Sequence, residues 1–236
     1  MSFRAKVTAK VTAIAVTAAA CVLLAPTAMA SSHPVQVTGT KLKSGLLPPS
    51  AFQPHYVTIF AGNSGGRLEH GVTRRIPPMR CFIFWASIGV DKGYGETAFA
   101  TEMAGSKTGA DPVEEIFQQS VYQFASSRSA ASFYGQISAK YKSCRSVSEP
   151  DGNGGTLRQT VHARSAPRVG GHKSLLLVEY LTDSKVGGSP LVTDVLWTPV
   201  GTNVYMVSSQ LLNVRSPRPA LSSLMLKLIK RISALR

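Results

Sequence analysis

Four strand-length runs follow one another in the second half of the chain, and they constrain its fold more than any other feature. They cover residues 157–164, 173–182, 191–198 and 203–211. The separating segments are short and rich in Gly, Pro, Ser and Asp, which favour tight connections between neighbouring strands. Consecutive strands joined in this way pair side by side with alternating direction. The pattern therefore predicts an antiparallel sheet.

Two further segments have the periodicity of amphipathic helices. The first follows Ser126 and Ser127, either of which suits a helix N-cap. Its apolar stripe comprises Ala130, Phe133, Tyr134, Ile137, Tyr141 and Cys144. The second covers residues 218–235, with a stripe of Leu221, Leu224, Met225, Leu228, Ile232 and Leu235. This last helix either covers the sheet or lies on a membrane surface.

Two more strands are predicted earlier in the chain, over residues 97–103 and 116–124. Residues 46–52 suit a short helical turn, and residues 62–66 and 152–155 are Gly-rich turns. Residues 76–78 suit a loop, whereas residues 81–88 are dense in apolar side chains, which indicates burial. The order of elements predicts an α+β fold, with a mainly antiparallel sheet flanked by two main helices.

Residues 1–30 have the pattern of a secretory signal peptide. A basic start precedes an apolar run over residues 11–25, and Ala28-Met29-Ala30 matches a signal-peptidase site before Ser31. The apolar run is about 15 residues, shorter than the roughly 20 that span a bilayer. We therefore predict cleavage between Ala30 and Ser31 and a secreted, extracellular protein. The alternatives are lipid anchoring through Cys21 and retention of the apolar run as a membrane anchor.

The exported chain is predicted to have a flexible lead-in over residues 31–45 and a single domain over residues 46–236. Residues 31–45 are polar and lack periodicity. Cleavage would leave Cys81 and Cys144, an even pair in an oxidising compartment. A disulfide closing a loop of about 60 residues would contribute roughly 4 kcal/mol. A metal site would need more ligands at short spacing, so we predict none.

The charge of the chain is strongly positive, at +14 with His neutral. Residues 1–30 contain three basic and no acidic side chains, so the exported chain keeps a net charge of +11. This excess suits an anionic cell wall or membrane surface, although solvated surface charge is the simpler explanation. The basic residues are scattered, without an RNA-binding strand motif, zinc-finger spacing or basic helix. We therefore expect no nucleic-acid partner.

No local motif indicates catalysis. Gly62-Asn63-Ser64-Gly65-Gly66 resembles the nucleophile loop of trypsin-like proteases, but no acidic residue and only His33 and His55 precede it in the exported chain. Phosphate-binding and dinucleotide-binding glycine motifs are absent from the sequence, so no cofactor is expected. We predict that the protein is not an enzyme. A hydrolase whose residues assemble only in three dimensions is the less favoured alternative.

Four polar residues in the predicted strands are candidate ligand-binding residues. Glu179 and Asp194 interrupt two apolar strands, so each lies on the solvent face or lines a cleft. His162 and Arg164 share one face of a strand, because strand side chains alternate. That pair is either a basic wall for an anionic ligand or part of a solvated face.

Several segments resemble the PknH-like extracellular sensor domains of actinobacteria. The matching strand and helix are Val121-Tyr122-Gln123-Phe124-Ala125, Ser129-Ala130-Ala131-Ser132-Phe133-Tyr134 and Tyr141-Lys142-Ser143-Cys144. Pro77-Pro78-Met79-Arg80-Cys81 is similar to the segment of the family's earlier cysteine, and Thr202-Asn203-Val204-Tyr205 to its last strand. The resemblance covers most of the exported chain and is strongest from about residue 115 to residue 236.

This resemblance implies an antiparallel sheet with helices framing a cleft for an extracellular ligand. Some members lie outside a transmembrane serine/threonine kinase, and others are secreted proteins or lipoproteins that stand alone. The present chain looks like a secreted, stand-alone member. It lacks the second cysteine pair of many members and has Tyr141 where they have Trp. The resemblance thus implies a non-enzymatic, sensor-type domain that binds a small molecule or a cell-wall ligand.

Overall fold

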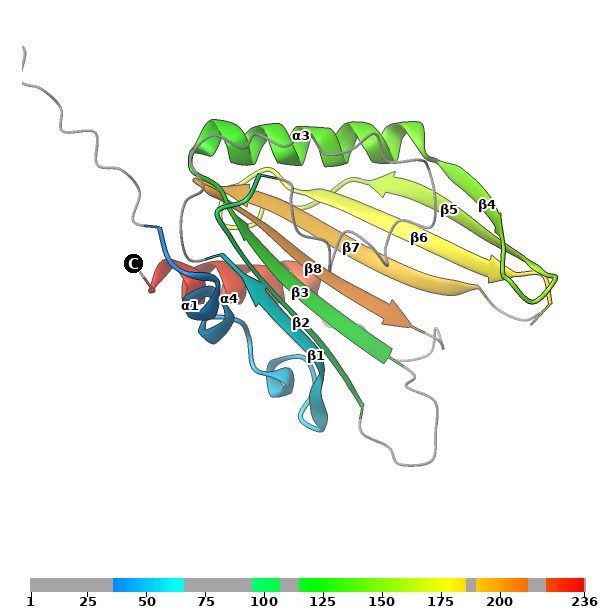
Figure 1. Ribbon diagram of the computed structural model, residues 1–236, viewed down its shortest axis with the longest axis horizontal. Helices are drawn as coiled ribbons and strands as arrows, with labels where there is room; N and C mark the ends of the chain where they lie inside the picture. Colours follow the sequence, from blue (N-terminus) through cyan, green and yellow to red (C-terminus); the bar gives the residue numbers. More distant parts are fainter. Residues whose placement is uncertain (1–35, 66–94, 107–114, 186–189, 212–219, 236) are drawn as a thin grey trace, which may run out of the picture. The chain divides into compact units, whose positions relative to one another are not determined.

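The structure is a computed structural model that describes residues 36–65, 95–106, 115–185, 190–211 and 220–235. Within them, eight strands form one antiparallel sheet in the order β1-β2-β3-β8-β7-β6-β5-β4 (Figure 1). The strands are β1 (Tyr56–Ser64), β2 (Ala98–Ser106), β3 (Glu115–Gln123), β4 (Ser146–Pro150), β5 (Thr156–Arg164), β6 (Leu175–Asp183), β7 (Leu191–Val200) and β8 (Asn203–Leu211). The helices are α1 (Gly39–Ser44), the 3-10 helix η1 (Pro49–Ala51), α3 (Ser127–Ser143) and α4 (Leu221–Ser233). The α+β prediction is confirmed.

Helix α3 connects the middle of the sheet to its far edge. It follows β3, the third strand in the spatial order, and leads into β4, the eighth. Five strand spacings are about 24 Å, and 17 helical residues extend about 25 Å. The helix is thus long enough for this crossing. The chain then returns strand by strand from β4 to β8, which pairs with β3.

Helices pack against both faces of the sheet, so its central strands β3, β8 and β7 are buried on two sides. On one face, α3 packs against aromatic side chains, and Tyr122 lies 5.0 Å from Phe133 and 6.1 Å from Trp197 between ring centroids. On the other face, α1 contributes the fully buried Leu42 and α4 the fully buried Leu228 to a second core. Since the sheet occupies the apolar face of α4, packing accounts for this helix without a membrane surface.

The sequence of α3 explains where it begins and which face it buries. The Ser126 hydroxyl accepts a hydrogen bond from the Ser129 backbone N–H at 3.1 Å, which caps the first turn. The predicted stripe faces the sheet, with Ala130, Phe133, Ile137 and Tyr141 buried and Tyr134 half-buried. Cys144 is the C-cap residue and is also buried. The predicted helix is therefore confirmed.

The expected flexible lead-in over residues 31–45 is wrong for its described part. Residues 39–44 form α1, which Thr38 caps through its hydroxyl. Two glutamines of β3 hold the backbone on either side of α1. Gln123 exchanges two hydrogen bonds with Val37, of 3.2 and 3.0 Å, and Gln119 exchanges two with Leu47, of 2.9 and 2.7 Å. A helix of six residues is too short to give a periodic signal in the sequence.

Two other local predictions differ from the structure. Residues 62–64, expected in a turn, belong to β1 and pair with β2. Among the described residues of this segment, only Gly65 adopts a turn-like backbone, with a φ of +92°, which glycine tolerates. Strand β4 was not predicted, because its five residues include Pro150 and two serines and resemble a loop. The short helical turn near residue 50 and the turn over residues 152–155 are confirmed.

Some predictions concern residues outside the described ranges. These include the signal peptide with Ala30 and Ser31, the alternative lipid site at Cys21, the loop over residues 76–78, the apolar segment 81–88 and Cys81. Within the described residues, no helix combines the length and the apolar character that crossing a membrane requires.

Candidate functional site

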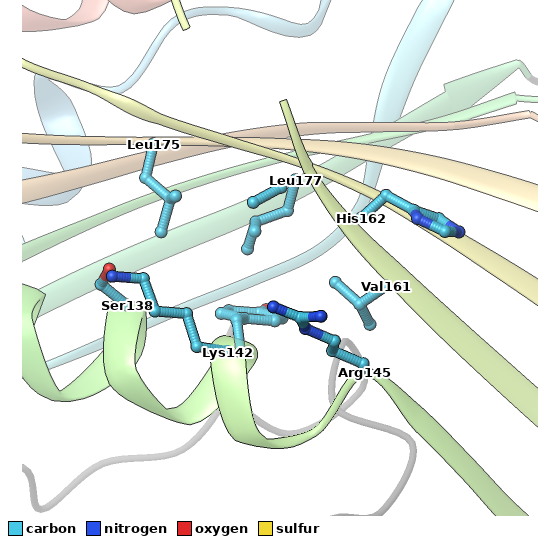
Figure 2. A pocket seen from close by; sticks show the side chains of 9 residues that line it. Ser138, Lys142, Arg145, Val161, His162, Leu175 and Leu177 are labelled. Carbon is cyan, nitrogen blue, oxygen red and sulfur yellow. The ribbon is translucent and has the colours of Figure 1, made fainter. Parts of the chain in front are cut away.

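A cavity of about 240 Å³ lies between the C-terminal half of α3 and strands β5 and β6 (Figure 2). A water molecule takes up about 30 Å³ in the liquid, so this volume equals about eight waters. The residues that line the cavity are Ser138, Tyr141, Lys142, Arg145, Val161, His162, Ala163, Leu175 and Leu177. The site is therefore concave and has the size of a small organic molecule.

The spacing of the lining residues follows from the helix and strands that carry them. Ser138, Tyr141 and Lys142 are three and four residues apart, which places them on one side of α3. Ala163 of β5 pairs with Leu177 of β6, so these two side chains are neighbours on the sheet. Figure 2 shows Ser138 and Lys142 of α3 on the side of the cavity opposite to Leu177.

The two sides of the cavity differ in polarity. The sheet side is apolar, with Val161, Leu175 and Leu177, whereas the helix side carries the cations of Lys142 and Arg145. Both cations are solvent-exposed. The Arg145 carbonyl accepts a hydrogen bond of 2.9 Å from the Val161 backbone N–H, which fixes the residue beside β5. No acidic side chain is among the described residues that line the cavity.

Glu179 lies on β6 two residues beyond Leu177 and on the same face of the strand, and it is only 1% exposed. Gln159 Nε2 donates to Glu179 Oε2 at 3.1 Å, and Tyr141 hydrogen-bonds the same carboxyl group. Glu179 Oε1 is buried without a hydrogen-bond partner among the described residues. Burial raises the pKa of Glu179 to about 7, against the opposing effect of these two hydrogen bonds. The group therefore changes its charge near neutral pH.

Tyr141 connects the cavity to this buried carboxyl group. It lines the cavity from α3, is only 5% exposed, and hydrogen-bonds Glu179. Burial raises the pKa of the Tyr141 phenol well above its ordinary range, and the nearby Glu179 charge raises it further. The phenol is thus a neutral hydroxyl at physiological pH. Since Tyr141 contacts both the cavity and Glu179, a ligand that moves the Tyr141 side chain would also change its hydrogen bond to Glu179.

A second buried glutamate shows how unusual Glu179 is. Glu115 accepts a hydrogen bond from the Tyr56 hydroxyl to Oε2 at 2.6 Å and one from Ser209 Oγ to Oε1 at 3.5 Å. Both of its oxygens thus have partners, which is the usual condition of a buried carboxyl group. Glu115 therefore suits a structural role. Glu179 is less completely satisfied and lies behind the cavity.

The four candidate residues from the sequence do not form one site. Glu179 pairs with Thr193, so the neighbouring Asp194 lies on the opposite face and is half-buried. His162 and Arg164 share the face opposite to Glu179, and both are exposed. The His162 ring packs edge-on against Tyr180 at 5.7 Å, and Figure 2 shows it directed away from Leu177. Only Glu179 lies beneath α3; His162 reaches the rim.

Three residues of the site were missed as functional candidates. Tyr141 was assigned to the apolar stripe and compared with the family's Trp, Lys142 was named only within the segment that resembles the family, and Arg145 was assigned to no feature. The available signal was two basic residues around the helix end, next to an aromatic residue of the stripe. Among the described residues, no group of three or more His, Cys, Asp or Glu side chains is arranged to hold a metal ion.

Comparison with solved structures identifies the fold. The chain resembles the extracellular domain of PknH from Mycobacterium tuberculosis with a TM-score of 0.59 and 14% identity, covering 85% of this chain and 98% of that one. The chain has the fold of this PknH extracellular domain. A Rv0999 ortholog from Mycobacterium smegmatis also matches, with a TM-score of 0.39 and 12% identity, over 86% of this chain and 98% of that one.

Two other comparisons found no match. No family model matches the sequence, and no curated protein matches it. The recognition of a PknH-like fold therefore depends on structure rather than on overall sequence identity.

Proposed function

We propose that this chain is an exported, non-enzymatic ligand-binding domain of the sensor type, and that its ligand occupies the cavity beside α3. The cavity is the observation that carries the proposal. A concave site with an apolar side and a few placed polar groups is the usual form of a small-molecule site. Here Leu175 and Leu177 supply the apolar side, and Tyr141, Lys142 and Arg145 supply the polar groups.

Separate observations support the proposed export of the chain and its proposed non-enzymatic role. The similar PknH structure is an extracellular domain, and residues 1–30 have the pattern of an export signal. The cavity contains the hydroxyl of Ser138, but the His162 ring packs against Tyr180 on the other face of the sheet. Among the described residues, the ring of His162 is therefore not placed beside the Ser138 hydroxyl to act as its general base. Binding is therefore the function that the geometry favours.

A second candidate function is attachment to an anionic cell wall or membrane by charge. It is favoured by the net charge of +11 after removal of residues 1–30. Exposed basic side chains also occur away from the cavity, namely Arg158, Arg164, Lys227 and Lys230. Such attachment would weaken with salt, because exposed charges are screened over about 10 Å at 0.1 M ionic strength.

Native mass spectrometry of the protein from its host's culture medium tests the first proposal. We expect a mature chain that begins at Ser31 and carries a co-purifying small molecule. The matched variant is Ala163→Leu, which adds volume at an exposed position of the cavity wall and should remove the adduct. An adduct that persists in this variant would place the ligand elsewhere. Recovery only from cell envelopes after a salt wash would favour the surface-attachment function.

A further inference from the structure

We infer that the cavity beside α3 recognises a compact amphiphilic carboxylate, with its charged end at Lys142 and Arg145 and its apolar end against β5 and β6. This inference rests on the proposed ligand-binding function and names the chemical class of the ligand. It follows from the arrangement of charge, apolar surface and volume in one site. Each of these features restricts the ligand in a different way.

The charged end of the ligand is indicated by the two cations. Lys142 and Arg145 both line the cavity, and no acidic residue is among its described lining residues. None of the described lining residues therefore neutralises them. A guanidinium group presents paired donors that match a carboxylate, and the ammonium group adds a second positive charge. An anion gains from both cations, whereas a cationic ligand is repelled by both.

The apolar end is indicated by the sheet side of the cavity. Val161, Leu175 and Leu177 lie side by side, and Leu177 has no exposed surface. The volume of 240 Å³ corresponds to about eight waters. A benzoate or hexanoate ion has a comparable size, whereas a long acyl chain exceeds it. The cavity thus favours a short or compact apolar group.

The buried carboxyl group behind the cavity does not oppose this assignment. Glu179 is not among the residues that line the cavity; it hydrogen-bonds Tyr141, which lines it, and Gln159 Nε2 donates to Glu179 Oε2. Burial raises the pKa of Glu179 to about 7, so a bound anion would favour its protonated, neutral form. Anion binding and proton uptake at Glu179 should therefore support each other.

The two cations also have a purely structural explanation, which the experiment must separate from binding. Lys140 and Lys142 lie in the last turn of α3, where positive charge interacts favourably with the helix dipole and stabilises the helix. Arg145 lies beyond the helix, next to β5. If the cations served only the helix end, their removal would change stability without changing the selectivity for ligands.

Isothermal titration calorimetry and amide chemical shifts of the full exported chain test the ligand class. Benzoate and hexanoate are the anionic probes, benzamide and hexanamide their neutral counterparts, and benzylamine the cationic counterpart. Inorganic phosphate tests binding by charge alone. Vesicles of phosphatidylglycerol test whether the anion belongs to a lipid surface. We expect the carboxylates to bind, with shifts around Tyr141 and Leu177, and the amides and benzylamine to bind at least tenfold more weakly.

Four variants locate the binding. The double variant Lys142→Ala with Arg145→Ala should weaken carboxylate binding at least tenfold, since the ligand loses both of its charge-assisted hydrogen-bond donors. The control is Lys227→Ala with Arg164→Ala, which removes the same charge from exposed positions outside the cavity. Ala163→Leu should abolish binding by occupying the apolar volume. Ala131→Leu, at an exposed position of α3 away from the cavity, is its control.

The outcomes distinguish this inference from the proposed function. Equal binding of benzoate and benzamide, blocked by Ala163→Leu, would overturn the carboxylate class while leaving a ligand-binding cavity. Binding to vesicles or phosphate without binding of the small carboxylates would also overturn it. If Ala163→Leu changes neither the binding of the probes nor the retention of an adduct by the native protein, the proposed function fails together with the inference.

Discussion

The hydroxyl of Tyr141 and the carboxyl group of Glu179 form a buried hydrogen bond that joins α3 to strand β6. Tyr141 also lines the cavity, so one side chain contacts both the proposed ligand site and the buried acid. Glu179 is 1% exposed, and its Oε1 atom has no hydrogen-bond partner among the described residues. The contact therefore couples the ionisation of a buried group to the covering helix.

Replacing Glu179 by Gln should remove a component of the pH dependence of stability. The pKa of Glu179 is about 7 in the folded protein, against an ordinary value of 4.5. The folded state then binds this proton more tightly than the unfolded state, so stability falls as pH rises from about 4.5 to about 7 and is constant above. The titration of Glu179 lowers the free energy of unfolding by about 3 kcal/mol over this range.

Urea unfolding at pH 5 and pH 8 measures this effect. We expect the wild-type free energy of unfolding to decrease more over this range than that of Glu179→Gln, and the variant to be the more stable protein at pH 8. Glu149→Gln, in the edge strand β4, is the matched control. Parallel pH profiles of wild type and Glu179→Gln would contradict the assignment.

Tyr141→Phe should raise the pKa of Glu179 above 7. The Tyr141 hydrogen bond lowers this pKa by stabilising the carboxylate, and the variant removes it while keeping the ring. Loss of the hydroxyl should also destabilise the fold by about 1–3 kcal/mol, because a buried acceptor loses its partner. Carbon-13 NMR titration of the Glu179 carboxyl group measures the shift. Tyr134→Phe, on the half-buried side of the same helix, should leave the titration unchanged.

Gln123→Leu should release the segment that leads into α1. The Gln123 side chain both donates to and accepts from the backbone of Val37. Leucine has nearly the same size but cannot make either bond, so we expect a loss of about 1–3 kcal/mol. Hydrogen exchange at residues 37–44 should become faster, with less change in the strands of the central sheet. Unchanged exchange in this segment would show that packing of Leu42 alone holds it.

The sequence predicted the sheet and the two main helices because their signals are local. The stripe of α3 from Ala130 to Tyr141 needs only the helical period, and the strands from β5 to β8 need only their apolar runs and turns. Helix α1 escaped prediction because its order depends on Gln123, which is 86 positions away from Val37. Long-range side-chain contacts of this kind leave no periodic pattern in the segment that they order.

The candidate site was harder to predict because it depends on which strands α3 covers. Glu179 and Asp194 look alike in the sequence, as single acids in apolar strands. Since Glu179 pairs with Thr193, Asp194 necessarily faces the other side of the sheet. Lys142 belongs to the polar side of α3 by periodicity, yet the adjoining β5 and β6 bring it to the edge of a cavity. Neither register nor helix position is visible in one sequence.

Cys81→Ser should destabilise the exported chain through loss of a disulfide to Cys144. Cys144 is 4% exposed at the C-cap of α3, and a bridge to Cys81 would tie the helix end to a segment about 60 residues earlier. Closing such a loop restricts the unfolded chain by about 4 kcal/mol. Differential scanning calorimetry should therefore show a lower Tm for Cys81→Ser than for the wild type.

Comparison of single and double variants decides whether the two cysteines are paired. If they are, Cys81→Ser and the double variant with Cys144→Ser lose nearly the same stability, because the first substitution already breaks the bridge. A reducing agent should lower the wild-type Tm and leave that of Cys81→Ser unchanged. The mass of the oxidised wild-type protein should lack two hydrogens. Additive losses with a Tm that is insensitive to reductant would mean that the thiols are separate, and the end of α3 would then be held by packing alone.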